Sequence, residues 1–149
     1  MPKASVKRLI ECNKDQLIDL VLDIENYPSF IPYCLNSKVY EKKEKEDLIS
    51  IIADLTIGKG QFKATYKSDV RYYKSIDTIR VTNIEGPLKH LNNKWTFIEK
   101  NNFTEIFFDI DFEIENKFLN IVMSKSFQYG LDKIADSFQK RANDLFKDK

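Results

Sequence analysis

Few residues in this sequence could perform acid–base, nucleophilic or metal chemistry. There is one histidine, His90, and the two cysteines, Cys12 and Cys34, lack C-x-x-C spacing and a neighbouring histidine. Because zinc and iron sites draw on clustered His and Cys, we expect no metal site and expect His90 to be an exposed loop residue. No Ser or Cys lies in a recognisable nucleophile motif, so no residue is predicted to be catalytic.

Three acidic residues, Asp109, Asp111 and Glu113, alternate along one segment and could supply an acid and a base. Their spacing places them on one side of a strand whose other side is apolar. A solvated charged face is the simpler interpretation, and we prefer it to a catalytic pair.

Two segments, 27–34 and 85–95, gather bulky apolar residues or glycine and proline between more regular stretches. In 27–34, Pro28 and Pro32 stiffen a run that includes Tyr27, Phe30 and Ile31. Two interpretations stay open: a loop that caps the core, or a gate at a cavity mouth that also touches lipid. We interpret 85–95 as a long connection between strands, and long connections in compact domains often carry function.

The elements that must position these residues follow from capping and periodicity. Asn13 and Gln16 have capping-box spacing, which predicts a helix that starts there and ends before Pro28. From Leu35 onward apolar residues recur at every second position, most clearly in 105–114, where all even positions are apolar. The spacers are too short for helical crossovers, so the sheet must be mainly antiparallel. The predicted strands are 3–11, 36–43, 48–57, 61–70, 76–84, 94–100 and 105–114.

The last thirty residues return to a helical period, with an apolar stripe that includes Leu131, Ile134 and Phe138. A helix of about six turns follows from this stripe. Since a one-faced antiparallel sheet needs a cover, we expect this helix to pack on the sheet. The sequence therefore predicts one α+β domain over residues 1–149, with a curved antiparallel sheet of about six to seven strands around a long C-terminal helix.

Composition narrows the function classes. The net charge is +1, which disfavours a dedicated DNA-binding protein. No apolar run approaches the ~20 residues of a membrane helix, and the N-terminus lacks the apolar segment of a signal peptide, so we expect a cytoplasmic protein. Eleven Phe, seven Tyr and one Trp exceed what a tight small core needs, and a hollow interior with an aromatic wall would use them.

Some lysines fall on neighbouring hairpins and could share one side of the sheet. A solvated face is the default interpretation, and contact with an anionic membrane or ribosomal RNA is the sharper alternative. These residues are Lys42, Lys43, Lys45, Lys59, Lys63 and Lys67.

Four motifs occur in one order along nearly the whole chain. They are Asp23-x-x-x-Tyr27-Pro28-x-Phe30-x-Pro32-x-Cys34, Gly86-Pro87-Leu88-x-x-Leu91 followed by Trp95, Asp111-Phe112-Glu113, and Phe138-x-x-Arg141-Ala142. Together they resemble the coenzyme Q-binding START-domain family, which includes ribosome association toxins (RatA), within the polyketide cyclase/START-like (SRPBCC) superfamily. Family members often have Phe at the position of Leu88 and Gly at that of Asn93, and these departures are mild.

The resemblance implies a helix-grip (START/Bet v 1-like) fold with a hydrophobic tunnel between sheet and helix. It implies a non-enzymatic carrier of ubiquinone or a related polyprenyl lipid that supports respiratory electron transport, with no required cofactor and with peripheral contact to a bacterial inner membrane. The expected cavity mouth or membrane contact comprises Tyr27, Pro28, Phe30, Ile31, Pro32, Leu88 and Leu91.

The inward-facing residues of the predicted strands and last helix would supply an apolar sleeve for such a lipid. Tyr66 and Trp95 carry polar tips that could hydrogen-bond a quinone carbonyl. A collapsed apolar core would give the same alternation. The predicted ligand-binding residues are Ile51, Leu55, Ile57, Phe62, Tyr66, Trp95, Phe108, Ile110, Phe112, Phe127, Leu131 and Ile134.

Two alternative functions follow from the same resemblance. One is a RatA-like toxin that binds the large ribosomal subunit and blocks subunit association, which the lysines favour and the near-neutral charge disfavours. The other is a polyketide cyclase/dehydrase, which we rank lowest because no acid and base stand together among the inward-facing residues.

Overall fold

The computed structural model describes residues 3–59, 62–86, 88–117, 121 and 127–146. Two α-helices, two short 3₁₀ helices and seven strands are defined within these residues. In chain order they are β1 (Lys3–Ile10), α1 (Lys14–Leu22), η1 (Ile24–Ser29), β2 (Cys34–Glu44), β3 (Leu48–Lys59), β4 (Phe62–Tyr73), η2 (Lys74–Ile76), β5 (Thr78–Glu85), β6 (Leu88–Lys100), β7 (Phe103–Ile114) and α3 (Phe127–Phe146).

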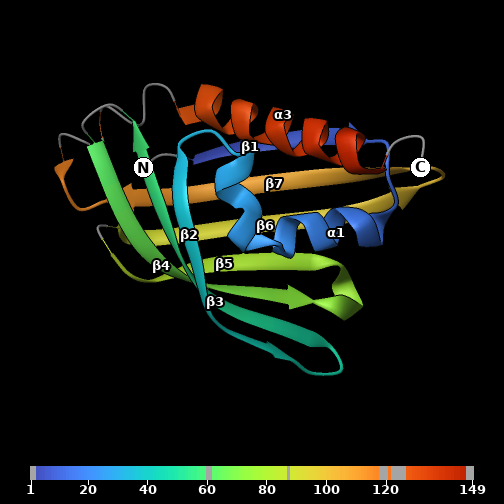
Figure 1. Ribbon diagram of the computed structural model, residues 1–149, viewed down its shortest axis with the longest axis horizontal. Helices are drawn as coiled ribbons and strands as arrows, with labels where there is room; N and C mark the ends of the chain where they lie inside the picture. The colour runs from blue at the N-terminus through green and yellow to red at the C-terminus, as the bar shows by residue number, and fades with distance from the viewer. Residues whose placement is uncertain (1–2, 60–61, 87, 118–120, 122–126, 147–149) are drawn as a thin grey trace.

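The seven strands form one antiparallel sheet in the order β1-β7-β6-β5-β4-β3-β2. The first strand of the chain pairs with the last, and the other strands follow as a meander. Figure 1 shows the strongly curved sheet, with α3 lying along β1 and β7 and with α1 beside it. The predicted α+β helix-grip architecture is therefore confirmed.

The local signals at α1 are also confirmed. The Asn13 side chain accepts from the backbone N–H of Gln16 at 2.8 Å, and the Gln16 side chain accepts from the backbone N–H of Asn13 at 3.3 Å. This capping box satisfies first-turn donors that the helix leaves unpaired. The helix ends at Leu22, and the following turns tighten to the 3₁₀ helix η1, which accommodates Pro28.

The prediction of a long connection over 85–95 is wrong. Strand β6 begins at Leu88, and its residues pair with β7 as far back as Leu88 and with β5 as far back as Asn92. Gly86 has a φ of 132°, a backbone angle that favours glycine and allows the chain to turn sharply between β5 and β6. His90 consequently lies on a strand and is half-buried, which corrects the expectation of an exposed loop residue.

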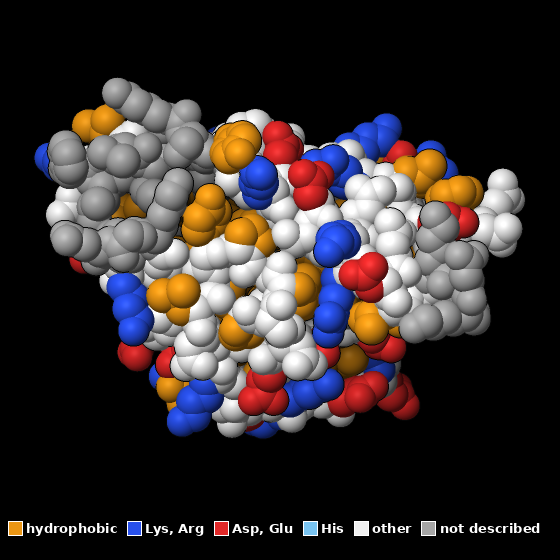
Figure 2. Space-filling view, turned by 45° about the horizontal axis from the view of Figure 1, so that its top comes forward, with side chains coloured by type: hydrophobic (Ala, Val, Ile, Leu, Met, Phe, Trp, Pro, Cys, Tyr) orange, Lys and Arg blue, Asp and Glu red, His pale blue; other side chains and the backbone are white. Residues whose placement is uncertain are grey.

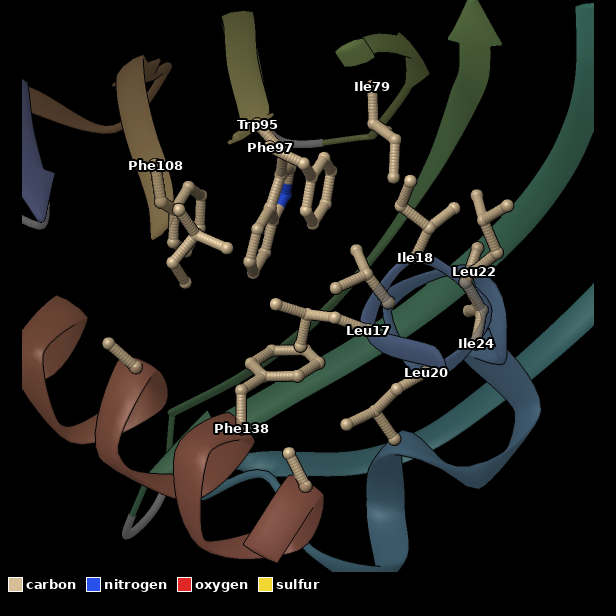
Figure 3. Close-up of a cluster of buried hydrophobic side chains, with 14 of the residues drawn as sticks. Leu17, Ile18, Leu20, Leu22, Ile24, Ile79, Trp95, Phe97, Phe108 and Phe138 are labelled. Atoms are coloured by element: carbon tan, nitrogen blue, oxygen red, sulfur yellow. The ribbon is translucent and has the colours of Figure 1, made fainter. Parts of the chain in front are cut away.

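The main core lies between the sheet, α1 and α3. Trp95 stacks on Phe108 with 4.0 Å between ring centroids, and Phe138 of α3 meets Trp95 edge-on at 5.1 Å. Figure 3 shows Phe138 pointing from α3 toward the sheet, beside Leu17 of α1. The edge-on contact between Phe138 and Trp95 is a favoured geometry for aromatic pairs.

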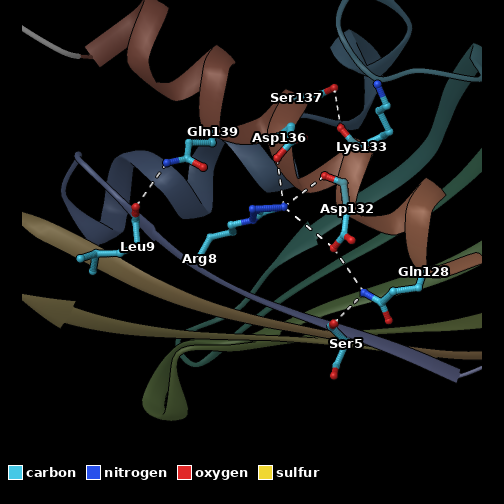
Figure 4. Close-up of polar contacts among 9 residues, drawn as sticks. All are labelled: Ser5, Arg8, Leu9, Gln128, Asp132, Lys133, Asp136, Ser137 and Gln139. Carbon is cyan, nitrogen blue, oxygen red and sulfur yellow. Dashed lines mark hydrogen bonds and ion pairs between the residues drawn. The ribbon is translucent and has the colours of Figure 1, made fainter.

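Polar contacts fasten α3 to β1 along the free side of that strand. Arg8 pairs with Asp136 at 3.0 Å and donates to the backbone carbonyl of Asp132 at 3.3 Å. The amides of Gln128 and Gln139 donate to the backbone carbonyls of Ser5 and Leu9 (Figure 4). Polar side chains of α3 thus attach the helix to β1, in addition to the apolar residues that pack against the core.

Candidate functional site

The structure distributes the predicted ligand-binding residues over two hydrophobic clusters. Ile51, Trp95, Phe108 and Leu131 are buried in the main core, and Leu55, Ile110 and Ile134 are half-buried against it. Tyr66 and Phe112 belong to a second cluster, and Ile57 is half-buried on β3. The side chains of Phe62 and Phe127 lie outside the described part of the structure. Binding of a ligand by these residues stays a prediction.

The 3₁₀ helix η1 and the segment that joins it to β2 pack into the core. The Tyr27 hydroxyl donates to the backbone carbonyl of Val21, and the Tyr27 ring meets Phe138 edge-on at 5.6 Å between centroids. Burial raises the pKa of Tyr27. Phe30 meets Phe138 at 5.3 Å, and the Arg141 guanidinium lies 5.3 Å from the Phe30 ring centroid. The segment caps the core through these contacts.

The other predicted mouth residues differ in exposure. Ile31 and Leu91 are 9% and 5% exposed, so neither side chain reaches far into solvent. Pro28, Pro32 and Leu88 are half-buried.

The second cluster lies at the end of the sheet where β6 begins. Its buried members are Leu91, Phe112 and Ile114, with half-buried Tyr66, Val81, Leu88 and Ile110 around them. Val81 and Ile110 also pack against the main core, so the two clusters meet at these residues. Burial raises the pKa of Tyr66, whose main chain lies so close to Gly86 that no larger residue fits there.

Asn93 lies where the two clusters meet. The register pairs it with Ile110 on β7 and with Val81 on β5, and alternation places it on the face that carries Leu91 and Trp95. Its Oδ1 is buried, and among the described residues no donor reaches it. We call Asn93 with Tyr66, Val81, Leu91 and Ile110 the Asn93 site.

Asn93 is not among the predicted site residues. A signal was present, because Leu91, Trp95 and Phe97 form an odd-numbered apolar series on one strand that Asn93 interrupts. Buried polar side chains are normally hydrogen-bonded, so an unpaired one inside an apolar surface indicates a missing partner.

A hollow of about 530 Å³ crosses β1, β7, β6 and β5 and also touches Gln128 of α3. Most of its lining residues are polar types, and the residues flanking the row Ala4, Ile110, Asn93 and Val81 have side chains that alternation directs away from the core. Of the predicted ligand-binding residues it includes only Ile110, so it does not form an apolar sleeve. Its lining residues are Lys3, Ala4, Ser5, Arg80, Val81, Thr82, Asn92, Asn93, Lys94, Asp109, Ile110, Asp111 and Gln128.

Two of the three acidic residues considered on β7, Asp111 and Glu113, contact basic side chains or His90. Asp111 contacts His90 Nε2 at 3.1 Å and Lys3 Nζ at 3.9 Å, and Glu113 contacts Lys89 Nζ at 3.3 Å. Within the part of the chain that the structure describes, no group of three His, Cys, Asp or Glu residues could hold a metal ion. In the same part, no helix is long and apolar enough to cross a membrane.

Comparison with known proteins gives two kinds of relative. The chain is 28% identical over 146 residues to a ribosome association toxin RatA of Rickettsia prowazekii, covering 94% of this chain and 95% of the toxin. It is 31% identical over 135 residues to a mitochondrial coenzyme Q-binding protein of Dictyostelium discoideum, covering 89% of this chain and 64% of that protein.

Solved structures share the fold. An 18 kDa protein from Caulobacter crescentus superposes with a TM-score of 0.80 at 26% identity, covering 97% of this chain and 98% of the other. The Zhui aromatase/cyclase of a Streptomyces species superposes with a TM-score of 0.79 at 11% identity, covering 95% and 93%. Residues 10–139 match the family described as polyketide cyclase / dehydrase and lipid transport, and the chain belongs to that family.

Proposed function

We propose that this protein binds a polyprenyl quinone, such as ubiquinone, between the sheet and α3, as cargo rather than as a catalytic cofactor. The observation that carries the proposal is the buried, unpaired Oδ1 of Asn93, whose neighbours on the same face of the sheet are apolar. A quinone has a compact head that carries oxygen atoms and a long apolar tail. Such a ligand needs an apolar surface with one or two placed polar groups.

Two further findings support a lipid ligand. The family description includes lipid transport, and the Dictyostelium relative carries coenzyme Q binding in its name. Tyr66, Val81 and Ile110 are half-buried, so these apolar side chains are more accessible from solvent than Trp95 and Phe108, which are 4% exposed.

A carrier fits the Asn93 site better than a cyclase. Cyclisation and dehydration need a positioned acid or base. The residues next to Asn93 on its face of the sheet are Leu91, Trp95, Val81 and Ile110, none of which titrates near neutral pH. His90 and Asp111 form a hydrogen-bonded pair. Because side chains alternate along a strand, both point to the face of the sheet opposite to that of Asn93 and Ile110.

The proposal is tested by lipid analysis and by titration. Protein purified from its own host is extracted and examined by native mass spectrometry, and lipid-free protein is titrated with a short-chain ubiquinone. Trp95 is the one tryptophan in the chain and lies two residues from Asn93, so we expect saturable quenching of its fluorescence. An extract without quinone or polyprenyl species, together with no saturable quenching, would refute the proposal.

A second candidate function is binding to the large ribosomal subunit. The relative named RatA aligns over nearly its whole length, which favours this function. The structure offers weaker support, because Lys43 and Lys67 of the predicted basic face are paired with Glu41 and Glu85. Sucrose-gradient profiles of ribosomes with excess protein decide the matter, since unchanged association of the subunits would count against it.

A further inference from the structure

The amide of Asn93 is unusual for its position in the sheet. Its cross-strand partners, Ile110 and Val81, are aliphatic, and its neighbours on the same face of β6 are Leu91 and Trp95. None of these four side chains offers a hydrogen bond at the Asn93 Oδ1, and no other described residue does.

An unpaired buried amide oxygen lowers the stability of the folded protein, because the atom loses its hydrogen bonds to water and gains none. Leucine has nearly the same shape as asparagine and would join Leu91, Val81 and Ile110 without this cost. Asn93 is therefore better suited to an occupied site than to a closed core.

We infer that Asn93 is the polar anchor of the ligand, whose amide hydrogen-bonds an oxygen atom of the head group. The inference deepens the proposed function and takes the quinone class of ligand from it. An amide offers both an N–H donor and a carbonyl acceptor, and rotation of the side chain exchanges them. A quinone carbonyl accepts from the N–H group and a quinol hydroxyl donates to the carbonyl, so one residue serves both redox forms.

A single substitution at this position should change stability and ligand affinity in opposite directions. Asn93→Leu should raise the melting temperature of the lipid-free protein, because an unpaired polar group is removed. It should weaken binding of a short-chain ubiquinone and of its quinol by about tenfold each, the value of one lost hydrogen bond. A purely structural asparagine would give the reverse, a lower melting temperature and unchanged affinity.

Asn92→Leu is the matched control. Asn92 is the preceding residue of β6, is exposed, and points to the opposite face, so the same change there should leave quinone affinity unaltered. Asn93→Gln, which keeps the amide, should restore part of the affinity lost in Asn93→Leu. If the wild type and Asn93→Leu bind equally well, the anchor is refuted while quinone binding stands. If the wild type binds no quinone, both proposals fail.

A spectroscopic measurement keeps the inference testable if Asn93→Leu does not fold. Ubiquinone labelled with ¹³C at a ring carbonyl is bound to the wild-type protein, and its carbonyl stretch is recorded by infrared difference spectroscopy. A hydrogen bond from Asn93 should lower that frequency relative to the same quinone in hexane. An unshifted carbonyl at both labelled positions would overturn the anchor.

Discussion

Cys12 and Cys34 are both free and buried, which sets their chemistry apart from that of reactive cysteines. Burial raises the pKa of the Cys12 thiol from 9.0 to about 11, and it also raises the pKa of Cys34. The thiolate is the nucleophilic form, and reactive cysteines sit in electropositive surroundings that lower the pKa. Neither cysteine therefore lies in surroundings that favour the thiolate.

The Cys12 pKa predicts slow alkylation. At pH 9 the folded protein should react with iodoacetamide at Cys12 roughly fiftyfold more slowly than a free thiol, because far less thiolate is present. The rate should climb as the pH approaches 11. Peptide mass spectrometry measures the modification, with urea-unfolded protein as the control. Equal rates in folded and unfolded protein at pH 9 would contradict the assignment.

The same shift has a consequence for stability. A thiol whose pKa is raised by folding stabilises the folded state below pH 9, and this contribution is lost as the pH rises through the folded value.

Residue types alone could not have revealed the state of Asn93. Alternation along the sequence predicts that Phe108 faces inward, and Phe108 is buried in the structure. Whether a buried amide has a donor depends on which side chains face it from β5 and β7, and that is decided by the strand register. The sequence pattern therefore indicates where Asn93 lies on its strand, but it does not indicate which side chains surround its amide.

At the level of elements, the turn between β5 and β6 depends on Gly86. A Cβ atom at this position would lie 2.8 Å from the Tyr66 Cβ and 2.9 Å from its Cα. Because one contact is with the main chain of β4, the strain cannot be relieved by moving a flexible side chain. Gly86 thereby fixes the spacing between the start of β6 and Tyr66 in the Asn93 site.

Gly86→Ala should lower the free energy of unfolding by about 1–3 kcal/mol, because the substitution adds both a clash and an unfavourable φ. Urea denaturation measures the effect. Gly130→Ala is the matched control, since a Cβ at that position of α3 meets nothing within 4 Å and alanine favours helix. The control should be neutral or stabilising by up to about 1 kcal/mol. Equal stability of Gly86→Ala and wild type would show that the turn tolerates a side chain.

Periodicity predicted most elements well and failed where the period is interrupted. The even-numbered apolar series of 105–114 lies in β7, and the apolar stripe through Leu131 and Phe138 lies on α3, as predicted. The start of β6 was missed because a register shift between Leu88 and His90 breaks the alternation. A bulge of this kind leaves no two-residue pattern for sequence analysis to detect.

At the scale of the whole molecule, several exposed aromatic and aliphatic side chains lie outside the segment 27–34, where we predicted membrane contact. Leu35 and Tyr129 are 54% and 61% exposed, whereas Phe30 packs on Phe138. Lys133 lies 5.3 Å from the Tyr129 ring, and its hydrogen bond to Tyr129 is the main cause of its raised pKa. Figure 2 shows such mixtures of hydrophobic and basic side chains on one face of the molecule.

We predict that Tyr33, Leu35 and Tyr129 contribute to peripheral membrane contact, since aromatic and basic side chains favour the headgroup region. Replacing all three with serine should reduce sedimentation of the protein with anionic vesicles. The control variant replaces the exposed residues Ile76, Ile84 and Ile98 with serine, which removes comparable apolar surface from other elements. Equal loss in both variants, or no loss in either, would exclude a specific contact by these residues.

The contacts between α3 and β1 also govern how the molecule meets its own copies. A seven-stranded sheet of this kind ends in two edges, and unpaired edge carbonyls can recruit a further strand from another chain. Here Gln128 and Gln139 occupy the carbonyls of Ser5 and Leu9 on one edge, while two register shifts distort the pairing of β2 on the other. By occupying these edge carbonyls, α3 thus also disfavours the addition of a strand from another copy of the chain at β1.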